Sequence, residues 1–132
     1  MLFKTPPSDF KKEIDVVGCY LEHEGKFVLL RREESKTHGG KWGLPAGKVH
    51  AGETIQAAMA REIKEETGVE LEENKLHHLG SLAVRNNGHD LDYHMFTAKL
   101  AEKPEIQISP AEHRDFAWVS PAEALQSTHF YS

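Results

Sequence analysis

Cysteine is nearly absent from this 132-residue chain, which contains only Cys19, within an apolar stretch. A single cysteine excludes an intrachain disulfide framework and fits a reducing environment, while its apolar neighbours predict a buried thiol. Long apolar runs are also missing, since no segment approaches the roughly 18 apolar residues of a membrane span. Residues 1–15 lack the apolar core and cleavage site of a signal peptide. We therefore expect a cytoplasmic protein without a membrane-spanning segment.

Positive charge is scarce as well. The chain has 16 Lys and Arg against 21 Asp and Glu, for a net charge of −5. This balance argues against nonspecific binding to nucleic acid or anionic membrane, although a local basic pocket for a phosphorylated ligand remains compatible with it. Nine histidines are present, but none has a recognisable zinc-ligand spacing to another His or Cys.

Length and patterning predict one α+β domain, a mixed sheet with helices packed on it. Its hydrophobic content of 39% and charged content of 28% are ordinary for a soluble globular protein. Residues 1–12, which include Pro6-Pro7, predict a loosely ordered arm. The expected elements are a strand hairpin at 13–23 and 26–32, a strand at 42–49 broken by Pro45, a helix at about 54–67, a second hairpin at 75–85 and 91–100, a strand at 115–119, and a helix at 120–125 with a capping box from Ser120 to Glu123.

The helix before Gly68 has its acidic residues at the unfavourable end. Glu62, Glu65 and Glu66 lie in the last turns, where the helix dipole is negative and an exposed acid is disfavoured by roughly 0.3–1 kcal/mol. Glu62 and Glu66 also form a like-charged i,i+4 pair. The sequence therefore raises the question of what compensates this repulsion.

Helical periodicity indicates that at least one of these acids faces inward. At about 100° per residue, Ile55, Met59 and Ile63 form one apolar stripe. Glu66 falls in line with this stripe and Glu62 lies at its edge. A buried carboxylate without a partner is unfavourable, so Glu66 requires a cation or a bound proton.

The nearby residues favour a metal ion as that cation. Arg61 is i,i+4 from Glu65 and can hold one carboxylate, but it cannot neutralise three. Glu53, just before the helix, adds a fourth acid. Oxygen ligands gathered without His or Cys suit Mg²⁺ or Mn²⁺ better than Zn²⁺. Periodicity alone leaves a second interpretation open, a glutamate-rich helix that is simply solvated.

The wider stretch GKVHAGETIQAAMAREIKEETGV, residues 47–69, resembles the Nudix box. Five residues separate Gly47 from Glu53, and seven more precede Arg61-Glu62. The resemblance implies a Nudix hydrolase with the Nudix fold, a mixed β-sheet sandwiched between α-helices, over a single domain of residues 1–132. The remaining matched positions are Ile63, Glu65-Glu66, Gly68 and Val69.

The family pattern also implies roles for the box residues. Glu62, Glu65 and Glu66 resemble the acids that bind Mg²⁺, with Mn²⁺ as an alternative. Arg61 resembles the residue that orients a catalytic glutamate, and Glu53 an acid that supports the metal shell.

Two positions outside the box complete this site. The backbone carbonyl of Ala46 matches a frequent metal ligand, although the family usually has glycine there. Glu112 matches a later glutamate that serves as ligand or base, and an ordinary loop acid is an equally good interpretation.

The implied reaction is hydrolysis of the diphosphate linkage in a nucleoside diphosphate derivative, with Glu62 or Glu112 accepting a proton from water. Cations near the box can reach phosphates, and Trp42 can stack on a base. For any one cation, solvated surface charge is the simpler interpretation, as is packing under the loop for Trp42. The candidate phosphate-binding cations are Arg31, Arg32, Lys41 and Lys48.

Sequence leaves the substrate open among nucleotides, nucleotide sugars and dinucleotides. Val84 stands where enzymes of the ADP-ribose branch tend to have proline, and the tyrosine typical of diadenosine-polyphosphate enzymes is missing. The alternative function is a Nudix-like ligand sensor or scaffold without hydrolysis, and a homodimer is compatible with the sequence. Retention of every box acid favours the enzyme.

Overall fold

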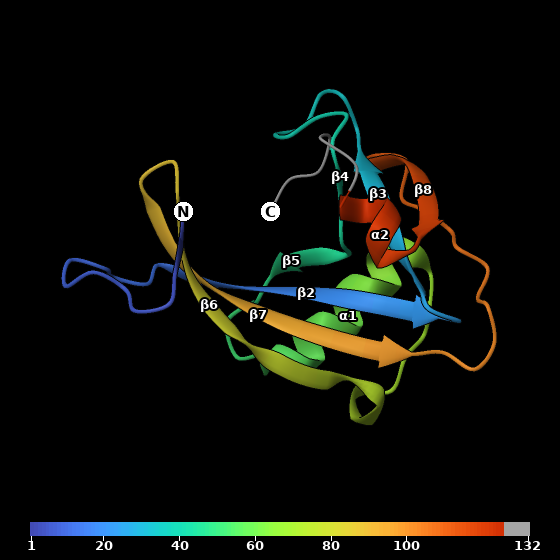
Figure 1. Ribbon diagram of the computed structural model, residues 1–132, viewed down its shortest axis with the longest axis horizontal. Coiled ribbons are helices and arrows are strands. Elements are labelled where there is room, and N and C mark those ends of the chain that lie inside the picture. Colours follow the sequence, from blue (N-terminus) through green and yellow to red (C-terminus); the bar gives the residue numbers. More distant parts are fainter. Residues whose placement is uncertain (126–132) are drawn as a thin grey trace.

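The computed structural model describes residues 1–125, which form one mixed β-sheet and two α-helices (Figure 1). This arrangement confirms the α+β prediction. Among the described residues, no helix is long and apolar enough to cross a membrane. The elements are β1 (Leu2–Phe3), β2 (Ile14–His23), β3 (Lys26–Arg32), β4 (Trp42–Gly43), β5 (Ala46–Lys48), α1 (Ile55–Thr67), the 3₁₀ turn η1 (Glu73–Lys75), β6 (His77–Asn86), β7 (His89–Lys99), β8 (His113–Val119) and α2 (Pro121–Leu125).

The sheet runs in the order β1-β6-β7-β2-β3-β4, with β5 paired to β2 and β8 paired to β3. The pairing of β2 with β7 is parallel, and the other strand pairs are antiparallel. Figure 1 shows α1 behind β2 and β7, and α2 beside β3 and β8. The main core lies between α1 and the sheet, where it includes Val17, Cys19 and Leu21 of β2. The Cys19 thiol is buried, as predicted, and burial raises its pKa to about 12.

Local sequence signals set both ends of α1. The Thr54 side chain accepts a hydrogen bond from the Ala57 N–H at 3.1 Å, which caps the N-terminus. Gly68 has a φ of 77°, a left-handed conformation that favours glycine, and its N–H donates to the Lys64 carbonyl. The predicted helix and its glycine stop are therefore confirmed.

The second predicted hairpin, β6 and β7, is confirmed, and it turns at Asn87-Gly88. The first hairpin forms only at its tip, where Glu22 pairs with Phe27 and His23 with Lys26. Beyond the tip the two strands diverge, because β2 pairs with β7 and β5 while β3 pairs with β8 and β4. This divergence leaves room for β5 next to β2, which brings the start of the box against the sheet.

The short elements agree with the predictions, except for the first strand at the N-terminus. Pro45 separates β4 from β5, and the capping box of α2 forms, with the Glu123 N–H donating to Ser120 Oγ at 3.2 Å. The expected loosely ordered arm is wrong for Leu2–Phe3, which pairs with β6 as a strand. The open edge of β6 provides hydrogen-bonding groups for it, and the Lys11 N–H donates to Asp90 Oδ2 at 2.8 Å.

Candidate functional site

Two acids of the box are buried at the C-terminal end of α1. Glu66 is 4% exposed and Glu62 is 8% exposed, whereas the Glu65 side chain is 56% exposed. The helix therefore turns Glu62 and Glu66 toward the same side as the core residue Ile63, in agreement with the periodicity. A solvated glutamate-rich helix does not account for this burial.

Carboxylates from two parts of the chain meet around Glu66. Burial, the adjacent Glu62 side chain and the charge of Glu112 together raise the pKa of Glu66 to about 9. The Ala46 N–H opposes this shift by donating to Glu66 Oε1 at 3.0 Å. The structure thus brings together Glu62, Glu66, Glu112 and Ala46, four positions that sequence had selected.

Gly47 is part of the same enclosure. A Cβ atom at this position would lie 2.1 Å from Glu62 Cδ, so any other side chain would displace the carboxyl group. Gly47 pairs with Val17 in the sheet, which fixes its backbone. Glycine is therefore required at this position because the backbone lies in direct contact with a box acid.

Arg61 connects four groups around the acids. Its Nε and Nη2 donate to the two Glu53 oxygens at 2.7 and 2.9 Å, and Nη1 donates to Glu62 at 2.8 Å and Glu65 at 3.2 Å. Nη2 also donates to the Lys48 carbonyl at 3.0 Å. These bonds hold the pKa of Glu53 down to about 2, assisted by the His50 N–H, and raise the pKa of Arg61. The guanidinium thus fixes Glu62 and Glu53 relative to β5.

The family comparison decides how this arrangement is classified. The family model of the NUDIX domain matches residues 12–131. The chain belongs to the Nudix family.

Relatives and solved structures agree with this assignment. A CTP pyrophosphohydrolase of Escherichia coli K12 is 30% identical over 117 residues, 87% of this chain and 82% of the relative. A putative 8-oxo-dGTP diphosphatase 2 of Mycobacterium tuberculosis is 38% identical over 100 residues, 73% of this chain and 65% of the relative. The crystal structure of the MutT protein from Methanosarcina mazei Go1 superposes with a TM-score of 0.80 at 30% identity, covering 92% of this chain and 86% of that one. Family membership and the intact box acids identify a Nudix-type pyrophosphohydrolase.

The predicted substrate-binding residues of this Nudix domain lie in separate places. Arg31 and Trp42 pair across β3 and β4, with the guanidinium 5.8 Å from the Trp42 ring centroid, and Arg31 Nε donates to the Gly40 carbonyl at 2.9 Å. Lys41 is exposed next to them. Lys48 lies on β5 within the box, and its backbone carbonyl accepts the hydrogen bond from Arg61.

Arg32 is directed elsewhere. Its Nε donates to the Thr37 carbonyl at 3.0 Å, within the loop that follows β3. This bond favours a structural role in the loop.

A second group of metal-ligand types was not predicted. Asp15, Asp92 and His94 offer ligand atoms that all lie within 4.8 Å of one another. Lys12 Nζ already lies 3.3 Å from Asp15 and 3.8 Å from Asp92, and His94 Nε2 is 2.9 Å from Asp15. Asp15 lies on β2 and the other two residues lie on β7, far away in sequence, so no local spacing indicated the group. Their charges already have partners, whereas Glu66 has no cationic partner within residues 1–125.

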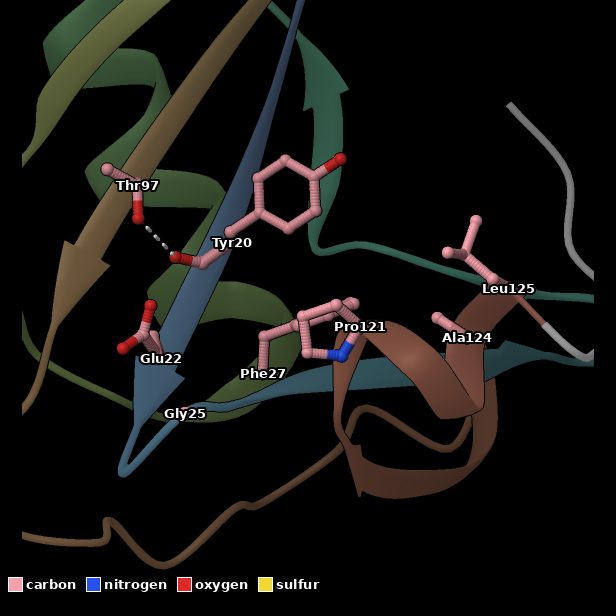
Figure 2. A pocket seen from close by; sticks show the side chains of 8 residues that line it. All are labelled: Tyr20, Glu22, Gly25, Phe27, Thr97, Pro121, Ala124 and Leu125. Carbon is pink, nitrogen blue, oxygen red and sulfur yellow. Dashed lines mark hydrogen bonds between the residues drawn. The ribbon is translucent and has the colours of Figure 1, made fainter.

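A pocket of about 460 Å³ on the other face of the sheet was also missed (Figure 2). Tyr20 and Glu22 are i,i+2 on β2 and therefore share a face, opposite to that of Cys19 and Leu21. This alternation was the signal available in the sequence. The lining residues are Tyr20, Glu22, Gly25, Phe27, Thr97, Pro121, Ala124 and Leu125.

Proposed function

We propose that this Nudix domain is a divalent-metal-dependent hydrolase of the diphosphate linkage in nucleoside diphosphate derivatives. The observation that carries the proposal is the buried Glu62–Glu66 pair. Burial and the proximity of Glu62 hold the pKa of Glu66 far above its ordinary range. Arg61 bonds to Glu62, but within residues 1–125 no cation pairs with Glu66. A site with these properties gains most from a bound cation.

The residues present fit Mg²⁺ or Mn²⁺. Glu62 and Glu66 would hold the ion, together with the Ala46 carbonyl, because the Ala46 N–H already bonds to Glu66 and the two groups are adjacent. Glu65 is exposed and bound to Arg61, which suits a ligand on the solvent side. Hard oxygen donors without His or Cys match these two metals. When bound, the cation supplies charge neutralisation at phosphate oxygens and makes water more acidic.

The chain's own residues then orient and deprotonate water. Arg61 holds the Glu62 carboxylate at 2.8 Å and is itself fixed by two bonds to Glu53, so Arg61 and Glu53 are positioning residues. Glu62 or Glu112 accepts the proton from the attacking water, since both carboxylates lie at the Glu66 end of the site. Lys48 is the best placed of the predicted cations to contact a phosphate.

The pocket on β2 is the proposed nucleoside site. Tyr20 lies two residues beyond Gly18, which pairs with Ala46, so the pocket begins roughly 6–7 Å along the strand from the box. Its volume of about 460 Å³ falls within the usual range for small-molecule sites. The relatives whose names give CTP or 8-oxo-dGTP as substrate support a nucleoside triphosphate over a nucleotide sugar or dinucleotide.

A substrate panel tests the proposal. Purified protein is incubated with nucleoside triphosphates, sugar nucleotides and dinucleotides in Mg²⁺ or Mn²⁺, and the products are separated by ion-exchange chromatography. We expect metal-dependent cleavage that chelator abolishes and that Glu66→Gln reduces. Tight nucleotide binding with no turnover under either metal would instead identify a ligand sensor.

A further inference from the structure

The Glu22 carboxylate lies in the proposed nucleoside pocket. Glu22 is half-buried on β2, and within residues 1–125 no hydrogen bond or ion pair joins its side chain to another residue. Glu53, another half-buried carboxylate, has the Arg61 guanidinium as its partner. A half-buried carboxylate that has no donor among the described residues is available to accept hydrogen bonds from a bound ligand.

The rest of the pocket defines what kind of donor fits. The Tyr20 and Phe27 rings meet edge to face, with centroids 5.2 Å apart, and provide an aromatic wall. Thr97 Oγ1 donates to the Tyr20 carbonyl, so its hydroxyl proton is already used. Of the described residues that line the pocket, none is Lys, Arg or His. The pocket therefore offers aromatic surface and acceptor atoms to a flat ligand that carries its own N–H donors (Figure 2).

We propose that Glu22 is a specificity-determining residue that selects guanine-type bases, an inference that rests on the proposed hydrolase function. The Watson–Crick edge of guanine presents N1–H and an N2 amino group side by side, and one carboxylate accepts both. Adenine and cytosine present one amino group beside a ring nitrogen with a lone pair, which the carboxylate repels. Uracil presents one N–H between two carbonyl oxygens. The carboxylate thus favours guanine over each of the others.

A comparison of GTP with ITP isolates this contact, because the two differ only in the exocyclic amino group. We expect wild-type kcat/KM for GTP to exceed that for ITP by about tenfold, the lower end for one hydrogen bond to a charged group in an open pocket. Glu22→Gln replaces one acceptor with a donor, so kcat/KM for GTP should fall by about tenfold. The values for ITP and UTP should change much less. Glu24→Gln removes the same charge from the exposed tip of the same hairpin and should preserve the GTP preference.

Three readouts separate the outcomes. Equal losses for GTP, ITP and UTP in Glu22→Gln would overturn the proposal, as would an unchanged GTP preference. A loss of kcat/KM confined to ribonucleotides, with dGTP unaffected, would show that Glu22 contacts the ribose hydroxyls. This result would also overturn the proposal. If no substrate is hydrolysed at all, the proposed function fails, and calorimetric binding of GDP against IDP to the wild type and to Glu22→Gln still decides the base contact. A thermal melt of each variant confirms that it is folded.

Discussion

Glu66 and Glu72 belong to the same acidic run of sequence but occupy different surroundings. Glu66 is buried on α1, whereas Glu72 follows the Gly68 stop and is exposed. We predict that Glu66→Gln lowers turnover by two or more orders of magnitude, because it removes charge at the proposed metal site. Glu72→Gln should keep turnover near wild type. Steady-state assays on the substrate found by the panel test the pair, and similar activity in both variants would contradict the metal-site proposal.

The raised pKa of Glu66 also predicts an inverse pH dependence of stability in metal-free protein. The folded state retains a proton up to a pKa of about 9 that the unfolded chain releases near the ordinary value of 4.5. Since the folded state binds more protons across this window, the free energy of unfolding should decrease as pH rises from about 5 to 9. The slope is at most about 1.4 kcal/mol per pH unit for one proton.

Urea unfolding in chelator at several pH values measures this slope. Glu66→Gln cannot release the proton and should give a flatter profile, whereas Glu72→Gln should follow the wild type. Parallel profiles for wild type and Glu66→Gln would show that the pair does not share a proton in the folded protein.

At the scale of elements, β5 can approach α1 closely because Gly47 has no side chain. Gly47→Ala would place a Cβ 2.1 Å from Glu62 Cδ, so the carboxyl group or β5 must move. We predict at least a tenfold loss of turnover together with weaker Mg²⁺ binding, because small displacements at a reacting site are costly. Ala46→Gly, at the neighbouring position of β5, retains the N–H and carbonyl and should keep near-wild-type activity. Wild-type kinetics in Gly47→Ala would show that the contact does not constrain Glu62.

Arg61 provides the second link between α1 and β5. We predict that Arg61→Lys lowers kcat substantially, since an ammonium cannot make the paired bonds to Glu53 while also holding Glu62 and the Lys48 carbonyl. Lys64→Arg, an exchange of the same two residue types on the exposed part of α1, is the matched control. A pH–rate profile for each variant checks that the loss reflects altered positioning, and equal kcat values for the two would exclude this role.

Local signals determined which elements could be predicted. Thr54 and Gly68 interact only with residues a few positions away, so the bounds of α1 follow from sequence. Glu62 and Glu66 were found because helical periodicity and box spacing are also local. The pocket residues Tyr20 and Glu22 come together with α2 only through tertiary packing, and the partial opening of the first hairpin depends on competition between distant strands. Neither the pocket nor the opening of the hairpin can be predicted from a short stretch of sequence.

For the whole molecule, the excess of carboxylates over cations at the box makes stability depend on metal. We predict that millimolar Mg²⁺ or Mn²⁺ raises the melting temperature of the wild type, because the ion binds the folded state only. Glu66→Gln should show a smaller increase. Differential scanning fluorimetry with and without chelator measures both, and an unchanged wild-type melting temperature across the metal range would count against the site.

The parallel pairing of β2 with β7 has a further consequence for how the domain folds. It joins residues 77 positions apart, such as Tyr20 and Thr97, whereas the β6–β7 hairpin closes through a short turn. Closing the longer loop has a higher entropic cost, so the transition state for folding should contain the hairpin before β2 docks on it. β5 pairs with β2 and carries Gly47, so the docking of β2 also brings the enclosure around Glu62 onto the sheet. In a nascent chain, the complete β2–β7 pairing forms only after synthesis of β7, which ends at Lys99.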